Sequence, residues 1–199
     1  MSYFFEFSRI QSASPAQPAD RARRAFVGAS GAMLSATAVA LLAGCEPLAA
    51  AQKGSSESDI SVLNTALSAE HEGIAAYQVG AESGLLSQGA LKVALQFQGH
   101  HKAHADLLAK TIAKLGGVAG APKAKYAFPV EQLKSEADVL RFAAGLEKGA
   151  VSAYLGAVPV FGNRDLAKAA ASILGDEAMH WAVLRQVLGE DPVPAAFVA

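Results

Sequence analysis

The chain has 199 residues, with 17 Lys and Arg residues against 18 Asp and Glu residues, and it contains a single cysteine. Near-neutral charge argues against a protein that holds nucleic acid through many phosphate contacts, so we expect no nucleic-acid partner, and one cysteine excludes an intrachain disulfide framework. The 52% share of hydrophobic residues suffices for one core, and the length suits one domain with an appendage.

The first 45 residues have the pattern of an export signal. Arg23 and Arg24 precede a run without charged residues from position 25 to 44, which is rich in Ala, Gly and Ser and ends at Cys45. A positive segment, an uncharged segment and small residues before the end predict a secretory signal peptide over residues 1–45. Residues 23–27 (RRAFV) resemble the twin-arginine export motif, and residues 42–45 (LAGC) resemble a bacterial lipobox.

This signal predicts the twin-arginine translocase as a partner during export and a lipid on Cys45. The lipid would anchor the protein on the periplasmic or cell-envelope side of a bacterial membrane. A transmembrane anchor is the competing interpretation, because about 20 uncharged residues can just span a bilayer. Residues 46–58, which include Pro, Ala, Gly and Ser, predict a flexible tether between the lipid and a folded domain over residues 59–199.

After Asp59 the hydrophobic period is near 3.6, which predicts four helices and an all-α domain. The first helix begins near Ser58 and Asp59, which can cap it, and the second ends at Gly116. The third begins with a capping box at 135–138, and the fourth is capped by Asp165. Short loops make antiparallel hairpins of the first and second pairs, while residues 118–134 form a long connection. A bundle with one long crossover is the ferritin-like arrangement.

The two hairpins look like copies of one unit. Shifting the chain by 76 or 77 residues superposes rare polar and aromatic positions of the first hairpin on those of the second. The superposed pairs are Glu70 with Glu147, Tyr77 with Tyr154, His101 with Glu177, and His104 with His180. Each hairpin therefore supplies one helix with a carboxylate and one helix with a histidine.

Glutamate and histidine interrupt the otherwise apolar stripes of all four helices. A buried ionised carboxylate must be neutralised, paired or bound to a metal, because leaving it alone costs many kcal/mol. Oxygen and imidazole donors together suit iron, manganese or zinc. Two interpretations stay open, a metal site and a hydrogen-bonded polar core. The candidate metal ligands are Glu70, His101, His104, Glu147, Glu177 and His180.

Other polar residues lie near these candidates along the chain. Tyr77 and Tyr154 follow Glu70 and Glu147 by seven residues, on the same helix face, where they can donate to the carboxylates, act as redox-active phenols or simply pack. His71 and His100 lie about 100° around the helix from their neighbours and are expected to flank the site. Gln98 offers an alternative ligand register on the second helix.

From position 59 to 197 the chain resembles the bacterial ferritin-like domain family that also includes plant desiccation-related proteins. The matching segments are 63–71 (LNTALSAEH), 146–157 (LEKGAVSAYLGA), 177–180 (EAMH) and 192–197 (PVPAAF). The resemblance implies, from di-iron members of the wider superfamily, one Glu from each first-type helix and Glu-x-x-His from each second-type helix. Glu177 and His180 follow that pattern, whereas His101 stands where the pattern has Glu.

The loss of one carboxylate favours an asymmetric metal pair, a single ion or no metal over a charge-balanced di-iron centre. Three functions follow as hypotheses. The first is an exported di-metal oxidase, ferroxidase or peroxide-handling protein, and the second is a module that binds metal without turnover. The third is a non-catalytic, stress-protective bundle. A monomer or a homodimer is expected.

Overall fold

The computed structural model describes the backbone of residues 46–198 and the side chains of residues 56–198. The long helices are α2 (Glu46–Glu82), α3 (Gln88–Lys114), α4 (Glu136–Ala157) and α5 (Arg164–Val187), joined by the short 3₁₀ helices η1 (Val130–Gln132) and η2 (Val158–Val160). Residues 46–198 contain no strand, which confirms the all-α prediction. None of the described helices has a stretch long and apolar enough to span a membrane. The predicted signal, with Arg23, Arg24 and Cys45, lies outside the described residues.

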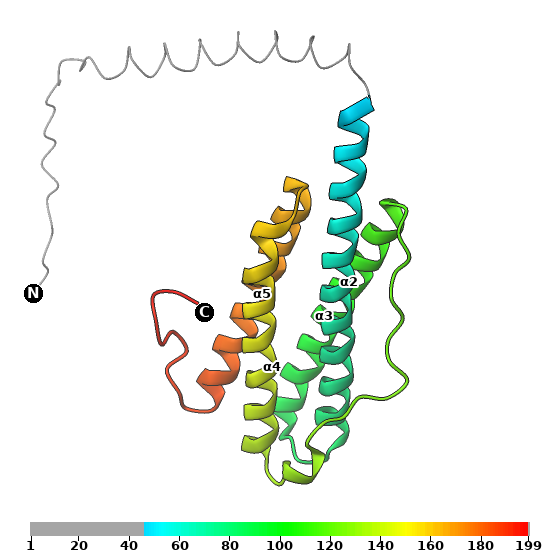
Figure 1. Ribbon diagram of the computed structural model, residues 1–199. Helices are drawn as coiled ribbons and strands as arrows, with labels where there is room; N and C mark the ends of the chain where they lie inside the picture. Colours follow the sequence, from blue (N-terminus) through cyan, green and yellow to red (C-terminus); the bar gives the residue numbers. More distant parts are fainter. Residues whose placement is uncertain (1–45, 199) are drawn as a thin grey trace, which may run out of the picture. The chain divides into compact units, whose positions relative to one another are not determined.

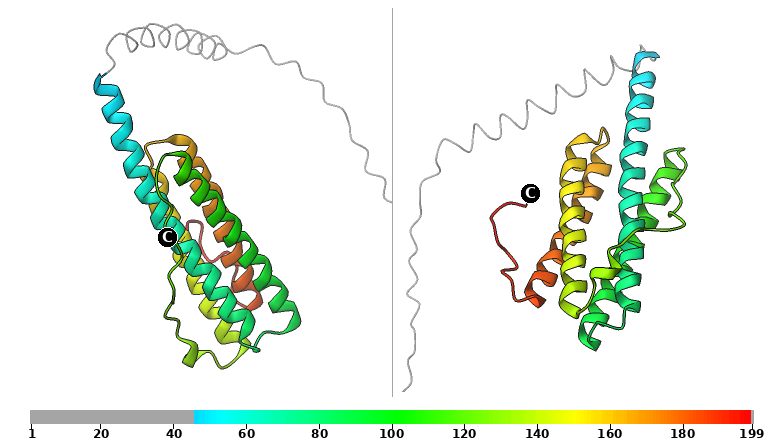
Figure 2. Two further views of the ribbon diagram at one scale, coloured as in Figure 1. Left: turned by 90° about the vertical axis from the view of Figure 1, so that its right-hand side faces the viewer. Right: turned by 60° about the horizontal axis from the view of Figure 1, so that its bottom comes forward.

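The four helices pack side by side as two antiparallel hairpins, α2 with α3 and α4 with α5 (Figures 1 and 2). The connection between α3 and α4 runs the length of the bundle, so that α4 begins at the end where α3 began (Figure 1). This confirms the predicted four-helix bundle with one long crossover. The topology brings one first-type helix and one second-type helix of each hairpin around a common interior.

The start of the first helix differs from the prediction. Residues 46–58 were expected to form a flexible tether, but the structure continues α2 through them from Glu46. Pro47 is compatible with a helix in its first turn, where its missing N–H has no intrahelical partner. The alanines at positions 49–51 are the strongest helix formers, and their propensity explains the extension.

Asp59 has a different role from the predicted helix cap. It lies inside α2, is buried, and accepts hydrogen bonds from the backbone N–H groups of Gly162 at 2.8 Å and Asn163 at 3.1 Å. Asn163, and not Asp165 as predicted, is the N-cap of α5, because its side chain accepts from the Asp165 N–H. Asp59 therefore ties α2 to the start of α5. The predicted cap of α4 is confirmed, since Ser135 accepts from the Asp138 N–H.

The long crossover is fastened to α2 by polar contacts. The Asn64 side chain donates to the Val118 carbonyl at 3.1 Å and accepts from the Gly120 N–H at 2.8 Å. The Nε2 of His71 lies 3.3 Å from the Gly120 carbonyl. His71 thus contacts the crossover and faces away from the bundle interior, as its position around the helix predicts.

Two apolar clusters fill the bundle. One gathers around Leu67, Leu108 and Ile112 toward the start of α5, and the other around Phe97, Leu140 and Leu184 toward its end. The polar residues on the helix stripes occupy the layer between these clusters. The core therefore excludes water from both sides of that layer, which makes the charges in it costly unless they are compensated.

Candidate metal centre

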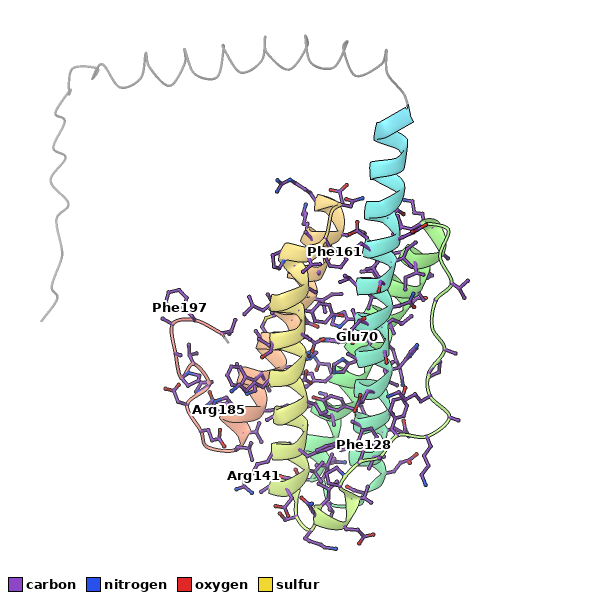
Figure 3. All side chains as sticks on the ribbon, viewed as in Figure 1. Glu70, Phe128, Arg141, Phe161, Arg185 and Phe197 are labelled. Atoms are coloured by element: carbon purple, nitrogen blue, oxygen red, sulfur yellow. The ribbon has the colours of Figure 1, made fainter. Side chains whose placement is uncertain are left out.

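All four long helices contribute to one buried polar layer in the middle of the bundle. Each of the six predicted ligands lies in this layer: Glu70 on α2, His101 and His104 on α3, Glu147 on α4, and Glu177 and His180 on α5. Glu147 and Glu177 are completely buried, and Glu70 is 2% exposed. Figure 3 shows Glu70 pointing into the interior of the bundle. The six side chains converge because they interrupt the apolar faces of the four helices at the same level of the bundle.

The six side chains form two overlapping sets of four donors, each within 4.8 Å of one another. His101 and Glu177 belong to both sets. The first set adds Glu70 and His104, and the second adds Glu147 and His180. The shared residues are the pair that the internal repeat superposes on each other, so the layer has an approximate two-fold relation in which one bridging position is an imidazole.

The donor atoms have the spacing that a transition-metal ion requires. Bonds of about 2.0–2.2 Å place neighbouring donors about 3.0–3.5 Å apart around a tetrahedral or octahedral ion. His104 Nδ1 lies 3.0 Å from Glu177 Oε1, and His180 Nδ1 lies 3.2 Å from Glu177 Oε2. Three buried atoms have no hydrogen-bond partner: His104 Nδ1, Glu147 Oε2 and Glu177 Oε1. The residues therefore fit a bound metal, because a cation would satisfy these orphaned atoms.

His101 occupies the centre of the layer. Its Nδ1 lies 2.8 Å from Glu70 Oε2, and its Nε2 lies 3.4 Å from Glu147 Oε1. The ring packs closely against α2 at Gly73, where a Cβ would lie 3.2 Å from two ring atoms of His101. Gly73 is thus the residue that admits an imidazole where the family pattern has Glu. Sequence reasoning missed it, since a glycine in a helix gives no signal of what packs against it.

Each of the two tyrosines on the layer contacts a glutamate of the other hairpin. Tyr154 on α4 donates to Glu70 Oε1 at 2.5 Å, and Tyr77 on α2 donates to Glu147 Oε1. Both hydroxyl groups are buried against a carboxylate. Burial and the adjacent negative charge raise the pKa of both phenols. Of the roles left open by the sequence, donation to the carboxylates is the one that the geometry bears out.

Charges within the layer compensate one another. Burial lowers the pKa of His101, but its hydrogen bonds with Glu147 and Glu70 outweigh that effect and raise the pKa to about 10. Burial also lowers the pKa of His104, but the nearby carboxylates of Glu177 and Glu70 outweigh it and raise that pKa to about 9. For His180, Glu147 and Glu177 outweigh burial and raise the pKa to about 9. Burial raises the pKa of Glu147, yet contacts with His101 and His180 leave it well below its usual range. Three imidazolium groups can therefore neutralise three carboxylates when protons take the place of metal.

Two further residues lie at the α3–α5 side of the layer. Asp176 Oδ2 lies 3.3 Å from His104 Nε2 and 3.3 Å from His180 Nε2, the nitrogens that face away from the three glutamates. The Nδ1 of His100 lies 3.1 Å from the same oxygen. Asp176 places a fourth carboxylate beside the layer, although this chain lacks the carboxylate that the family pattern has at position 101. Asp176 precedes Glu177 directly and lies about 100° around the helix from it. That position was the sequence signal that could have identified it.

Gln98 is not a ligand. Its amide nitrogen donates to the Ile74 carbonyl at 3.1 Å and to Gln78 at 2.8 Å, and its oxygen accepts from Lys102. These contacts satisfy the amide outside the layer, so the alternative register is wrong. His101 and His104 are the α3 residues that face the carboxylates.

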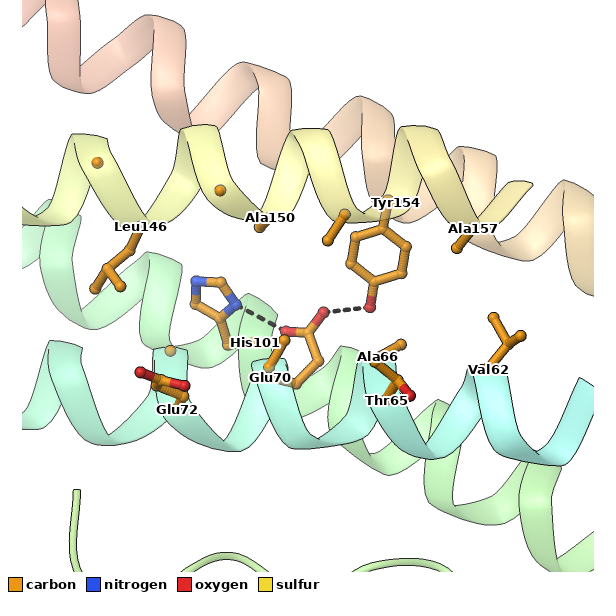
Figure 4. Close-up of a pocket in the computed structure, with 15 residues that line it drawn as sticks. Val62, Thr65, Ala66, Glu70, Glu72, His101, Leu146, Ala150, Tyr154 and Ala157 are labelled. Atoms are coloured by element: carbon orange, nitrogen blue, oxygen red, sulfur yellow. Dashed lines mark hydrogen bonds and ion pairs between the residues drawn. The ribbon is translucent and has the colours of Figure 1, made fainter. Parts of the chain in front are cut away.

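A pocket of about 390 Å³ reaches the layer from the face formed by α2 and α4 (Figure 4). Its walls are mostly small residues, among them Ala66 and Gly73 on α2 and Gly149 and Ala153 on α4. At its inner end lie Glu70, His101 and Tyr154, joined by hydrogen bonds (Figure 4). A small molecule can therefore approach the buried carboxylate through an apolar passage.

Comparisons with known proteins agree with this arrangement. The model of the ferritin-like domain family matches residues 58–190. A comparison with curated proteins gives no match. A solved structure of a conserved hypothetical protein from Mycobacterium tuberculosis is similar at 25% identity and a TM-score of 0.61, covering 66% of this chain and 98% of that one.

Two other solved structures share the fold. A ferritin-like diiron-carboxylate protein from Bacillus anthracis has 21% identity and a TM-score of 0.59, covering 67% of this chain and 97% of that one. A dodecameric thioferritin, the bacterioferritin-related protein of Bacteroides fragilis, has 24% identity and a TM-score of 0.59, covering 67% and 86%. The predicted ferritin-like fold is confirmed, while the desiccation-related likeness stays a prediction.

Stability of the metal-free protein should depend on pH through the three histidines. Their pKa values are raised from 6.5 to about 9 or 10, so their contribution is full below pH 6.5 and is lost as pH rises through that range. We expect the Tm of EDTA-treated protein to fall between pH 6.5 and 9.5, and Zn²⁺ to abolish the fall by binding the deprotonated rings. A Tm that does not change over this pH range, with or without Zn²⁺, would contradict the conclusion that charged histidines stabilise the metal-free layer.

Proposed function

The chain belongs to the ferritin-like domain family, and on that premise we propose that its buried layer binds two divalent transition-metal ions and reacts with dioxygen or a peroxide. Glu70 and His104 would hold one ion, Glu147 and His180 the other, and Glu177 would contact both. His101 adds a nitrogen donor at the remaining shared position. Iron and manganese bind carboxylate and imidazole donors and also change oxidation state. Zinc binds the same donors but has no redox chemistry.

The observation that carries this proposal is the set of three orphaned atoms, one on His104 and one each on Glu147 and Glu177. An unpartnered atom in a dry core is costly, and two of these atoms lie 3.0 Å apart without hydrogen-bond geometry between them. One cation between His104 Nδ1 and Glu177 Oε1 would satisfy both of these atoms, and a second ion would satisfy Glu147 Oε2. When bound, two such ions supply electrons to an oxygen species, and the bundle supplies geometry and exclusion of water.

The pocket between α2 and α4 supports an enzyme over a sealed metal store. Its apolar walls suit an uncharged small molecule such as dioxygen or hydrogen peroxide, and it ends at Glu70 and His101. Tyr154, which donates to Glu70 at the same point, orients the carboxylate and can supply a proton or an electron there. The chain's own residues thus bring a neutral oxidant to the edge of the layer.

Metal binding without turnover is the second candidate, and a stress-protective bundle is the third. The imidazole at position 101 favours them, because His101 can compensate Glu70 and Glu147 without any metal. Self-association stays a prediction for this chain. It is supported by the dodecameric assembly of the similar thioferritin.

Export and lipidation complete the proposal. The twin-arginine pattern at Arg23 and Arg24 and the LAGC segment ending at Cys45 support delivery to the outer side of a bacterial membrane. Expression of the full chain with a Cys45→Ser substitution should move the protein from the membrane fraction to the soluble periplasmic fraction. Replacing Arg23 and Arg24 with lysine should retain it inside the cell. Unchanged fractionation of both variants would refute the assignment of the signal.

Metal content tests the proposed centre. We expect about two equivalents of metal per chain of the exported protein, measured by mass spectrometry, and almost none in the Glu147→Gln, Glu177→Gln double variant. Glu131→Gln, in the exposed η1 segment, is the matched control and should keep its metal. Light scattering of the same samples gives the number of chains in the particle. A metal-free wild type that cannot be reconstituted would favour the protective bundle.

The pocket has its own test. Gly149 lines it, and a Cβ there meets open space, so Gly149→Leu should fill the passage without displacing α4. Consumption of dioxygen or hydrogen peroxide by the metal-loaded variant should slow several-fold at unchanged metal content. Gly156→Leu is the control, because Gly156 is also an unobstructed glycine of α4 but does not line the pocket. Equal slowing of both variants would show that the effect comes from the helix and not from the passage.

A further inference from the structure

The α3–α5 side of the polar layer carries a second arrangement of metal-ligating atoms. His100 Nδ1, Asp176 Oδ2 and His180 Nε2 lie close together, and it is the other ring nitrogen of His180, Nδ1, that approaches Glu177 and Glu147. His100 is 38% exposed and Asp176 is 22% exposed, whereas His180 is 2% exposed. The group therefore extends from the surface to the edge of the buried layer. Four of the five histidines of the chain belong either to this group or to the layer.

We propose that His100, Asp176 and His180 form an outer entry site at which a divalent transition-metal ion binds before it passes to the buried layer. This inference rests on the proposed function, because it concerns how the buried layer obtains its metal. Two imidazoles and one carboxylate are a donor set that suits iron, manganese or zinc, and three protein ligands leave positions for water on the solvent side.

The distances support binding of one ion by all three residues. His100 Nδ1 lies 2.8 Å from His180 Nε2 and 3.1 Å from Asp176 Oδ2, and His180 Nε2 lies 3.3 Å from the same oxygen. Donors around an ion with bonds of about 2.0–2.2 Å have a similar separation. Only a small opening of the contact between His100 and His180 is needed to admit the ion.

His180 connects the outer site with the layer because it faces one through each ring nitrogen. Its Nδ1 lies 3.2 Å from Glu177 Oε2 on the inner side, and its Nε2 lies 3.3 Å from Asp176 Oδ2 on the outer side. The same ring would therefore hold an ion at either site, through a different nitrogen at each.

The opposite face of the layer is a poor route for a cation. The pocket between α2 and α4 is lined mostly by Ala, Gly, Val and Leu, which cannot replace the water that a divalent ion loses. Before its inner end it offers side-chain oxygen atoms only from Thr65 and Glu72, and no histidine. Asp176, by contrast, also lies 3.3 Å from His104 Nε2, so it contacts both histidines that lead to the two inner positions. Metal and neutral oxidant would therefore reach the layer from different faces.

Loading kinetics of the full chain with Co²⁺, followed by its visible absorption, test the entry site. His100→Ala should slow uptake by the buried layer by about 10-fold or more, while the tightly bound Co²⁺ that remains per chain after removal of weakly bound ions stays as in wild type. His71→Ala is the matched control, because His71 is another partly exposed histidine, on the neighbouring helix α2, and its ring nitrogen contacts the crossover at Gly120. Its uptake rate should not change.

A second measurement separates the entry site from the inner layer. The Glu70→Gln, Glu147→Gln variant should retain about one weakly bound Co²⁺ per chain, and adding His100→Ala should remove it. Equal uptake rates for wild type and His100→Ala, with no residual ion in the Glu70→Gln, Glu147→Gln variant, would overturn the entry site and leave the proposed function standing. A wild type that takes up no Co²⁺ would overturn both.

Discussion

Three carboxylates buried between two apolar clusters are the constraint on which the rest of this bundle depends. Each isolated charge would cost several kcal/mol in a dry core, and Glu147 and Glu177 have no exposure to water. The surrounding helices respond with histidines on α3 and α5 and with hydroxyl donors from Tyr77 and Tyr154. Protons on the imidazoles balance the layer without metal, and divalent ions can replace those protons. The same side chains thereby stabilise the fold and, in the proposed function, would bind the metal.

The internal repeat gives the layer its two-fold arrangement, and one substitution within the repeat breaks it. Glu177 and His101 occupy equivalent shared positions, but one is an anion and the other a base. Gly73 makes the imidazole possible by leaving room on α2. Asp176 adds a carboxylate on the outer side of the histidines, at the edge of the layer, whereas position 101 in its interior has none. The layer is therefore asymmetric, with a polar face between α3 and α5 and an apolar face between α2 and α4.

Sequence patterns predicted the helices, the crossover and the six converging side chains because these depend on helical period, loop length and the rarity of Glu and His on apolar stripes. They did not predict the extension of α2 before Asp59, where alanine propensity prevails over the glycine and serine residues. They placed His100 at the flank of the site, where it lies, but they missed its partner Asp176, and they also missed Gly73. Those roles depend on how two helices face each other in space, which the period of a single helix does not encode.

Crystals grown with Mn²⁺ would test the central claim most directly through anomalous scattering. The account predicts two anomalous peaks within the layer, one beside Glu70 and His104 and one beside Glu147 and His180, with Glu177 between them. Loss of the short contact between His101 and Glu70 should accompany them, since the ions replace the compensating proton. A map without peaks in the layer, with every histidine still paired to its carboxylate, would contradict the metal centre and identify the layer as a self-compensated polar core.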